Sequence, residues 1–455
     1  MNRRYVLLIT SLAAFLTPFM GSAVNIALPA IGARFAASAI GLGWVATAYT
    51  LAAAVALVPL GRLADLRGRE IVFTVGIGID AFASLGCAFA PALDWLNALR
   101  ALQGNGGAMI FGTCTAMLSA AYPPQDRGRV LGINVAAVYS GLSLGPLLGG
   151  ILTQHLGWRG VFYSYVLLSV TTLVLALVSL KPRPNPKTEL PFDFTGSVVY
   201  AAGLVMLMYG LPQLPAGRGW VLVGAGLIAL LIFARWELVA PSPVLDIRLF
   251  RGNRTFAFSN LAALINYSAT AAIGFLLSLY LQHARQLTPQ AAGLVLVSQP
   301  VVQALFSPLA GRLSDRVAPR VIASLGMALT VVGLTRFAFL TERTPLWSIA
   351  LALALLGFAF ALFSSPNTNA IMGSVEQPFY GVASGVLATM RLIGQMLSMG
   401  VSLLVFSVFA GHLPINRATY HLFLPGTRLA FAVFAALCLL GVFASLARGR
   451  RPAAA

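Results

Sequence analysis

The chain has 455 residues, of which 58% are hydrophobic and 9% are charged, and its mean hydropathy is +0.86. Soluble domains carry about 25% charged residues, so this composition excludes a soluble globular protein. The net charge of +18 would indicate a nucleic-acid partner in a soluble chain, and its distribution along the sequence decides how it is interpreted here.

Apolar runs long enough to cross a membrane recur along the whole chain. About 20 apolar residues span a hydrocarbon core of ~30 Å, and charged or Pro/Gly-rich segments separate the runs. The first run is too long for the core of a signal peptide and is kept as a span. We predict an all-α polytopic membrane protein with fourteen transmembrane helices, at 5–29, 42–61, 71–90, 95–120, 129–153, 160–180, 195–213, 219–238, 255–281, 290–310, 320–340, 346–371, 380–410 and 425–447.

The Lys and Arg residues gather in alternate loops between these helices. If the N-terminus is cytoplasmic, twenty of them lie on the inner side, seven on the outer side and three within spans. Lys and Arg favour cytoplasmic loops, so we expect both termini in the cytoplasm and the helices in the cell's inner (plasma) membrane. This distribution accounts for the net charge, and we expect the lipid bilayer, not nucleic acid, as the surrounding partner.

No residue pattern points to a metal, a cofactor or an enzyme. Cys87, Cys114 and Cys438 lie in apolar runs, and the four histidines fall in or near loops. Neither set has the spacing of metal ligands or of a disulfide framework. Nothing resembles the phosphate-binding loop Gly-x-x-x-x-Gly-Lys-Ser/Thr, so we expect no ATP-driven step.

One charged segment occurs twice. GRLADLRGRE at 61–70 follows the second predicted helix, and GRLSDRVAPR at 311–320 follows the tenth. When the two helices between 195 and 238 are set aside, the copies lie six helices apart, as in the parallel repeats of some secondary transporters. The sequence predicts an N-terminal six-helix bundle at 1–182, a linker with two inserted helices at 183–254 and a C-terminal six-helix bundle at 255–455.

Further motifs occur in the first half of the chain. VNIALP at 24–29 closes the first span, Arg100-Ala-Leu-Gln103-Gly104-Asn-Gly106-Gly107 lies in the fourth, and a Gly-x-x-x-Gly-Pro-x-x-Gly-Gly pattern at 141–150 lies in the fifth. Together with the segment at 61–70, these motifs resemble those of the major facilitator superfamily, specifically its fourteen-span drug:proton antiporter branch. GVASGVLATMRLIGQ at 381–395 extends the resemblance into the second half. It implies the fold of that superfamily, with two inserted helices.

We call the two charged segments, at 61–70 and 311–320, the charged hinges. The resemblance implies that they form a conformational latch. A carboxylate near a helix N-terminus is stabilised by the helix dipole, and arginines can pair with it directionally. The alternative is a solvated turn that carries arginines because it faces the cytoplasm. The candidate latch residues are Gly61, Arg62, Asp65, Gly68, Arg69, Gly311, Arg312, Asp315 and Arg316.

The glycines of the fifth span recur on one helix face. Gly141, Gly145 and Gly149 are four residues apart, so another backbone can approach closely along this face. Pro146 kinks the helix, and Gly150 completes the pattern. We expect close packing here that also permits sliding or sealing between helices.

Ionisable residues inside the bilayer are costly unless they are paired or hydrated. Asp80 is predicted to be the only acid in a span interior, and it is the natural candidate for protonation. The alternative is a structural role, with Asp80 bonded to a neighbouring helix. Arg100 and Arg391 match positions that the resemblance associates with coupling or substrate contacts, whereas Arg336 is near a span end and is expected to reach the interface.

The sequence departs from the antiporter branch in its first span. Met20, followed by Gly21 and Ser22, occupies the place where an acid attracts cationic drugs in that branch. We therefore expect a neutral, zwitterionic or anionic amphiphile as the substrate. Other polar residues interrupt apolar helices and are candidates to line a substrate cavity, namely Asn25, Tyr49, Gln103, Tyr139, Asn260, Asn266, Gln299, Gln303, Asn367, Asn369 and Gln395.

The favoured function is a secondary active transporter that exports amphiphilic small molecules in exchange for protons, by alternating access. An uncoupled facilitator or a lipid-like flippase of the same fold is the first alternative, favoured by the scarcity of acids. A non-transporting membrane sensor or scaffold is the second. We expect no enzyme activity and a monomeric state.

Overall fold

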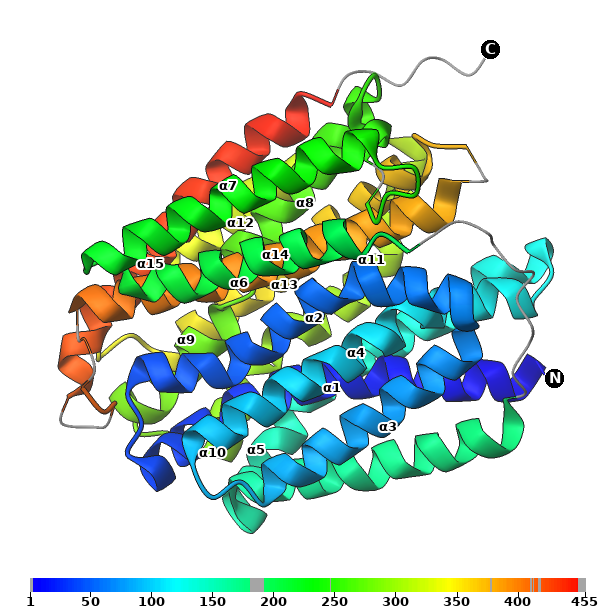
Figure 1. Cartoon of the computed structure of the whole chain (residues 1–455). Helices are drawn as coiled ribbons and strands as arrows, with labels where there is room; N and C mark the ends of the chain where they lie inside the picture. Colours follow the sequence, from blue (N-terminus) through cyan, green and yellow to red (C-terminus); the bar gives the residue numbers. More distant parts are fainter. Residues whose placement is uncertain are drawn as a thin grey trace.

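The computed structural model describes residues 3–180, 192–245, 247–376, 379–409, 411, 413–415 and 419–448, and within them the side chains of Pro124 and Asp315 are not described. The chain forms a bundle of long helices that run roughly along one axis (Figure 1). Helix α1 begins, and helix α15 ends, at the same end of this bundle. The helices of the first part are α1 (Arg3–Phe35), α2 (Ala39–Arg67), α3 (Arg69–Ala88), α4 (Leu93–Ala121) and α5 (Pro124–Ser179).

Two helices and short connecting turns form the middle of the chain. These are α6 (Phe194–Gly210), η1 (Leu211–Gln213), α7 (Gly217–Val239) and η2 (Ile247–Phe250). The last part contains α8 (Arg254–Thr270), α9 (Ile273–Leu279), η3 (Tyr280–Ala284), α10 (Pro289–Leu296), α11 (Ser298–Arg316), α12 (Pro319–Ala338), α13 (Leu346–Met372), α14 (Tyr380–Phe409) and α15 (Tyr420–Leu446).

A helix lies in every range predicted from the sequence, and several helices continue beyond their range, whereas α3 and α12 end two residues before theirs. Helix α1 extends to Phe35 because its end is set by Ala36, which has a φ of +46°. Helix α2 begins at Ala39, where the Ser38 side chain accepts a hydrogen bond from the N–H of Gly41. Such caps satisfy the free N–H groups of a first turn. Composition alone does not reveal these ends.

Twelve helices or helix runs in the described part of the chain are long and apolar enough to cross a membrane. The chain is therefore a multi-pass, all-helical protein. Helix α5 counts once among the twelve, although Gly157, with a φ of +72° and a ψ of 173°, interrupts its helical backbone. Helix α4 is not among them; its motif places Arg100, Gln103 and Asn105 within two turns. The count of fourteen crossings stays a prediction.

Helix packing groups the early helices with one another and the late helices with one another. Helix α1 packs along α5, α2 and α3 pack along α4, and α3 also contacts α5. In the later part, α11 and α12 pack on α13, α12 packs on α15, and α8 packs on α14 and α15. The proposed division into two bundles rests on this grouping.

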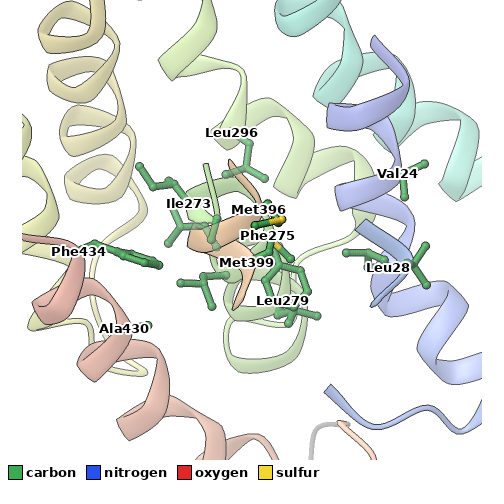
Figure 2. Close-up of a cluster of buried hydrophobic side chains, with 14 of the residues drawn as sticks. Val24, Leu28, Ile273, Phe275, Leu279, Leu296, Met396, Met399, Ala430 and Phe434 are labelled. Carbon is green, nitrogen blue, oxygen red and sulfur yellow. The ribbon is translucent and has the colours of Figure 1, made fainter. Parts of the chain in front are cut away.

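A shared apolar cluster joins the two groups. It includes Val24 and Leu28 of α1, Phe275 of α9 and Met396 and Met399 of α14, all buried. Figure 2 shows these side chains with others from α10 and α15. Burial of such side chains contributes roughly 25 cal/mol per Å² of apolar surface removed from water, but between lipid-exposed helices close packing is the larger contribution.

Helix α6 and the turn η1 pack against one helix from each group, and α7 packs on α6. The hydroxyl of Tyr200 on α6 donates to the carbonyl of Ala54 on α2 at 3.1 Å. On the other side, a Cβ added to Gly400 of α14 would lie 3.1 Å from Sδ of Met208 on α6. Helix α7 is the outer member of the pair and is largely exposed. The pair therefore covers the seam between α2 and α14 (Figure 1).

Candidate functional site

Asp80 lies on α3 inside the first group of helices and is 1% exposed. The hydroxyl of Tyr165, on the second part of α5, donates to its Oδ2 at 2.6 Å, and the Ser169 hydroxyl lies 3.4 Å from the same oxygen. Both donors face the carboxylate because they are four residues apart on one helix face. The acid is thus held between α3 and α5 by neutral hydrogen-bond donors.

A chain of hydrogen bonds leads from this acid to Arg100 on α4. The Ser84 hydroxyl donates to the backbone carbonyl of Asp80 at 2.6 Å and accepts from Nε2 of Gln103 at 2.7 Å. Oε1 of Gln103 in turn accepts from the guanidinium of Arg100. We call this set, with Tyr165, Ser169 and Tyr49, the Asp80–Arg100 network.

Arg100 is also held from the side of α2. Its Nε donates to the carbonyl of Val45 at 3.0 Å, and its guanidinium lies 4.6 Å from the centre of the Tyr49 ring. A cation over an aromatic face is stabilised more strongly when it is desolvated. Among the described residues no ion pair joins Arg100 to Asp80. The chain of hydrogen bonds from Arg100 ends at the backbone carbonyl of Asp80 and not at its carboxylate.

The glycines of the Arg100–Gly107 motif make room for this network. A Cβ added to Gly106 would lie 2.7 Å from the carbonyl of Gly76 and 2.8 Å from the N of Asp80, both on α3. One added to Gly104 would collide with the carbonyl of Tyr49, and one added to Gly107 with its hydroxyl. The motif therefore brings three helices to backbone contact around Asp80 and Arg100.

Arg391 is not part of this network; it lies on α14 in the second group of helices. Its guanidinium is 5.5 Å from the centre of the Tyr267 ring on α8 and 3.4 Å from the Thr368 hydroxyl on α13. Its Nε is buried without a hydrogen-bond partner among the described residues. The predicted coupling residues thus form two separate sites, Asp80 with Arg100 and Arg391 with Tyr267.

Two predicted cavity residues, on the helices that contact Arg391, carry unpartnered amide atoms. Both amide atoms of Asn266, next to Tyr267, and Oδ1 of Asn367, next to Thr368, have no partner in the described part of the chain. Buried polar atoms normally have a partner, so such atoms indicate a place for water or ligand. By contrast, both ends of the Gln103 amide are already bonded within the Asp80–Arg100 network.

The other predicted cavity residues differ in exposure. Asn260 and Gln303 are buried, and Asn260 donates to the carbonyl of Phe256 in its own helix. Asn369 is exposed and donates to the Ser314 hydroxyl at 2.7 Å. Asn25, Tyr139, Gln299 and Gln395 are half-buried. Arg336 is exposed, as expected from its place near a helix end, and donates to the Ser348 hydroxyl.

The first charged hinge forms the junction of α2 and α3. Gly68 has a φ of +104°, a conformation that favours glycine. Asp65 accepts from Arg69 at 2.9 Å across this turn, with both side chains partly exposed. An exposed pair at this spacing contributes only about 0.3–0.5 kcal/mol. The side chain of Arg62 donates to the hydroxyl of Ser242, in the segment after α7, at 2.9 Å.

The second hinge lies at the end of α11. Gly311 is half-buried, and Arg312 and Arg316 are exposed. The side chain of Asp315 lies outside the described residues. A latch that joins the two groups of helices therefore stays a prediction at both hinges.

The glycines of the fifth-span motif lie against α1, as their spacing predicts. Cβ atoms added to Gly141 and Gly145 would collide with the carbonyl of Phe15 and the hydroxyl of Ser22, and one added to Gly149 would lie 2.7 Å from Cα of Ala23. The predicted close approach of a second backbone is confirmed.

The same motif also contacts the later helices through its last residues. A Cβ added to Gly150 would lie 2.6 Å from the carbonyl of Pro289, the first residue of α10, and one added to Gly293 of α10 would collide with the carbonyl of Pro146. At this end of the bundle Ser278 of α9 donates to the carbonyl of Asn25 on α1 at 2.6 Å. Toward the other end, Gly132 of α5 and Gly385 of α14 have no atom within 4 Å of an added Cβ. The two groups thus meet tightly at one end.

Comparison with known proteins agrees with these motifs. The family model of the Major Facilitator Superfamily matches residues 10–261 and 259–455. This chain belongs to the Major Facilitator Superfamily. It is therefore a multi-pass membrane transporter and not an enzyme.

Curated relatives include transporters of different cargo. The chain is 28% identical to the riboflavin transporter RibZ of Clostridioides difficile, over 96% of this chain and 95% of that protein. It is 30% identical to the multidrug resistance protein Stp of Mycobacterium tuberculosis, over 88% and 76%. It is 32% identical to the cephamycin export protein CmcT of Amycolatopsis lactamdurans, over 98% and 93%.

Solved structures support the fold. A bacterial homologue of the human lysosomal transporter Spinster aligns over 98% of this chain and 97% of its own, with a TM-score of 0.71 and 18% identity. The nucleoside transporter NupG aligns over 98% and 100%, with a TM-score of 0.66 and 16% identity.

Some residues of this superfamily member could not be found from the sequence pattern. Tyr165, Ser84 and Ser169 are ordinary residues in apolar runs, and only the packing of α3, α4 and α5 makes them partners of Asp80. Glu237, on the last turn of α7, is a second fully buried acid that the sequence pattern did not single out. It lies at the end of its helix, so Asp80 as the only acid in a span interior stays a prediction.

Proposed function

We propose that this transporter exports amphiphilic small molecules in exchange for protons. The observation that carries the proposal is the buried carboxylate of Asp80, which accepts from the hydroxyls of Tyr165 and Ser169 and forms no ion pair with any described residue. The backbone carbonyl of the same residue is linked through Ser84 and Gln103 to Arg100. An acid at such a place can bind and release a proton within a transport cycle. Several relatives are named as export or multidrug resistance proteins, which supports outward transport.

The proposal includes the finer architecture of the drug:proton antiporter branch. It has fourteen crossings, with α4 and the two parts of α5 counted, and both termini in the cytoplasm. In that orientation, the end where α1 and α5 meet α9 and α10 is the outer end, so the structure is closed to the outside. The bundles 1–182 and 255–455 would then alternate by separating at the contact of Gly150 and Gly293.

The charge balance supports a substrate that is neutral, zwitterionic or anionic. Met20, Gly21 and Ser22 place no acid on this part of α1. The Ser22 hydroxyl donates to the carbonyl of Pro18 in its own helix and packs on Gly145. Arg391, half-buried beside the ring of Tyr267 on α8 and the Thr368 hydroxyl on α13, offers a cation, and the same two helices carry the unpartnered amides of Asn266 and Asn367. A cation and a few polar groups among apolar side chains suit loosely recognised apolar ligands with one polar anchor.

Transport in proteoliposomes tests the coupling. An imposed pH gradient should drive a test compound against its own gradient, and Asp80→Asn should abolish this uphill movement while downhill exchange continues. Asp94→Asn, a substitution at an exposed acid of α4, serves as the matched control and should change neither. Downhill movement that no gradient can reverse would identify an uncoupled facilitator or flippase, and no movement at all would favour a sensor or scaffold.

Resistance profiling tests the substrate class. The chain is expressed in an efflux-deficient bacterium, which is exposed to anionic, neutral and ethidium-type cationic compounds. We expect protection against the first two classes. A clear preference for the cations would contradict the assignment.

A further inference from the structure

A second buried acid lies in the middle pair of helices, away from the Asp80–Arg100 network. Glu237, on the last turn of α7, is fully buried, and its Oε2 accepts from the N–H of Leu245 at 2.8 Å. Its Oε1 is buried and has no hydrogen-bond partner among the described residues. A buried carboxylate with one oxygen unsatisfied is costly, so this atom needs a donor.

Another carboxyl, that of Asp193, lies close to that oxygen. Asp193 caps α6, its Oδ1 accepting from the N–H of Gly196 at 2.8 Å, and its Oδ2 accepts from the indole N–H of Trp236 at 2.9 Å. A Cβ added to Gly196 would lie 2.7 Å from Oε1 of Glu237 and would collide with Oδ2 of Asp193. The two oxygens therefore converge on the same point above the first turn of α6.

The described arginines of the neighbouring segments donate hydrogen bonds to groups other than these two carboxyls. Arg248 donates to the carbonyls of Leu238 and Ala240, and Arg62 donates to the hydroxyl of Ser242. Arg235 lies on the exposed face of α7, and Asp246 is outside the described residues. With no ion pair to either carboxyl among the described residues, two carboxylates this close cannot both be ionised, and one proton is shared between them.

We propose that Asp193 and Glu237 form a second proton-binding site, in which one proton on Oε1 of Glu237 is donated to Oδ2 of Asp193. Asp193 is half-buried and, with Ser242, lines a cleft of about 150 Å³. When the site deprotonates, the O–H bond of Glu237 breaks and the proton leaves to water by way of Asp193. The carboxylates of Asp193 and Glu237 then repel each other across the contact between the start of α6 and the end of α7.

The consequence reaches the first charged hinge. Glu237 fixes Leu245, and the segment between them presents Ser242 to Arg62 of the hinge. Loss of the shared proton separates the start of α6 from the end of α7 and makes this segment more mobile. The hydrogen bond from Arg62 to Ser242 is then weakened. Proton binding at the middle helices is thus linked to the α2–α3 junction independently of Asp80.

Infrared difference spectroscopy of the full chain in lipid tests the shared proton. Raising the pH should remove a carbonyl-stretch band of a protonated carboxyl in the wild type, and Glu237→Gln should lack this band. Asp80→Asn and Asp94→Asn are the controls, and both should keep it. In Asp193→Asn the band should be lost at a different pH, because the second carboxylate is gone. Identical pH-difference spectra for the wild type and Glu237→Gln would overturn the proposal. A band that is lost at the same pH in Asp193→Asn as in the wild type would show that the proton is not shared with Asp193.

Spin-label distances test the link to the hinge. Labels are placed by Arg67→Cys at the end of α2 and Val239→Cys at the end of α7, both exposed positions, since Cys87, Cys114 and Cys438 are buried. The distance distribution should broaden at high pH in this background and stay narrow when Glu237→Gln is added, because the amide donates to Asp193 at every pH. Equal broadening in both would overturn the link. Neither measurement needs a transported compound, so the result is independent of the proposed export.

Discussion

The hydroxyl of Tyr165 on α5 donates to Oδ2 of Asp80 on α3 at 2.6 Å, and this bond joins two helices around the acid that we assign to proton coupling. Asp80 lies on α3, and its bond to Tyr165 ties its carboxylate to α5. This pair is therefore the most direct place to measure how firmly the acid is held.

Tyr165→Phe removes that donor and leaves only the longer contact from Ser169. A hydrogen bond to an ionised group contributes about 1.5–3 kcal/mol, so the free energy of unfolding should fall by an amount of this order. A double-mutant cycle with Asp80→Asn, measured by unfolding in detergent, isolates the pair. Strictly additive effects of the two substitutions would contradict a direct bond.

Gly145→Ala should destabilise the contact of α5 with α1. The new methyl group would collide with the Ser22 hydroxyl, and overpacking of this kind typically costs about 1–3 kcal/mol. Gly132→Ala on the same helix is the control, because no atom lies within 4 Å of its added Cβ. That substitution should be neutral or stabilise the helix by up to about 1 kcal/mol. Unfolding temperatures of the two variants in the same detergent provide the comparison; a Gly145→Ala protein as stable as the wild type would be the contrary result.

Gly293→Ala should loosen the end of the bundle where α10 meets α5. Its methyl group would collide with the carbonyl of Pro146, so the two groups of helices must separate slightly there. A cysteine introduced at the half-buried Asn25 reports on this end, and its rate of thiol modification should rise several-fold. Gly385→Ala, in open space on α14, should leave the rate unchanged. An unaltered rate in Gly293→Ala would mean that this contact does not seal the bundle.

Arg391→Gln should reduce transport of anionic compounds more than that of neutral ones. Loss of one charge-assisted hydrogen bond, about 1.5–3 kcal/mol, corresponds to roughly a 10- to 100-fold weaker affinity. Arg336→Gln, at an exposed arginine bonded to Ser348, is the matched control for the loss of positive charge. Apparent affinities for one anionic and one neutral compound check the prediction, and equal losses for both would assign Arg391 to structure.

The candidate site could be predicted only in part. Asp80, Arg100 and Arg391 stand out because charged residues are rare in apolar runs, and this rarity is visible without any coordinates. Their grouping is not visible, because it depends on which helix faces contact one another. The structure joins Asp80 to Arg100 through Ser84 and Gln103, and it places Arg391 with Tyr267 on the other group of helices. Gln103, expected in the cavity, instead has both ends of its amide bonded inside the network.

The sequence by itself determined that this chain is a helical membrane protein with a repeated charged hinge, because hydrocarbon length and the cost of unpaired backbone groups permit few other arrangements. It also determined the close approach at Gly145, since a glycine every four residues leaves one helix face bare. Tertiary structure alone decided that this face lies on α1 and that α6 and α7 cover the seam of α2 and α14. It likewise brought Glu237 to Asp193, because contacts between residues distant in the chain follow from how helices pack and not from any local pattern.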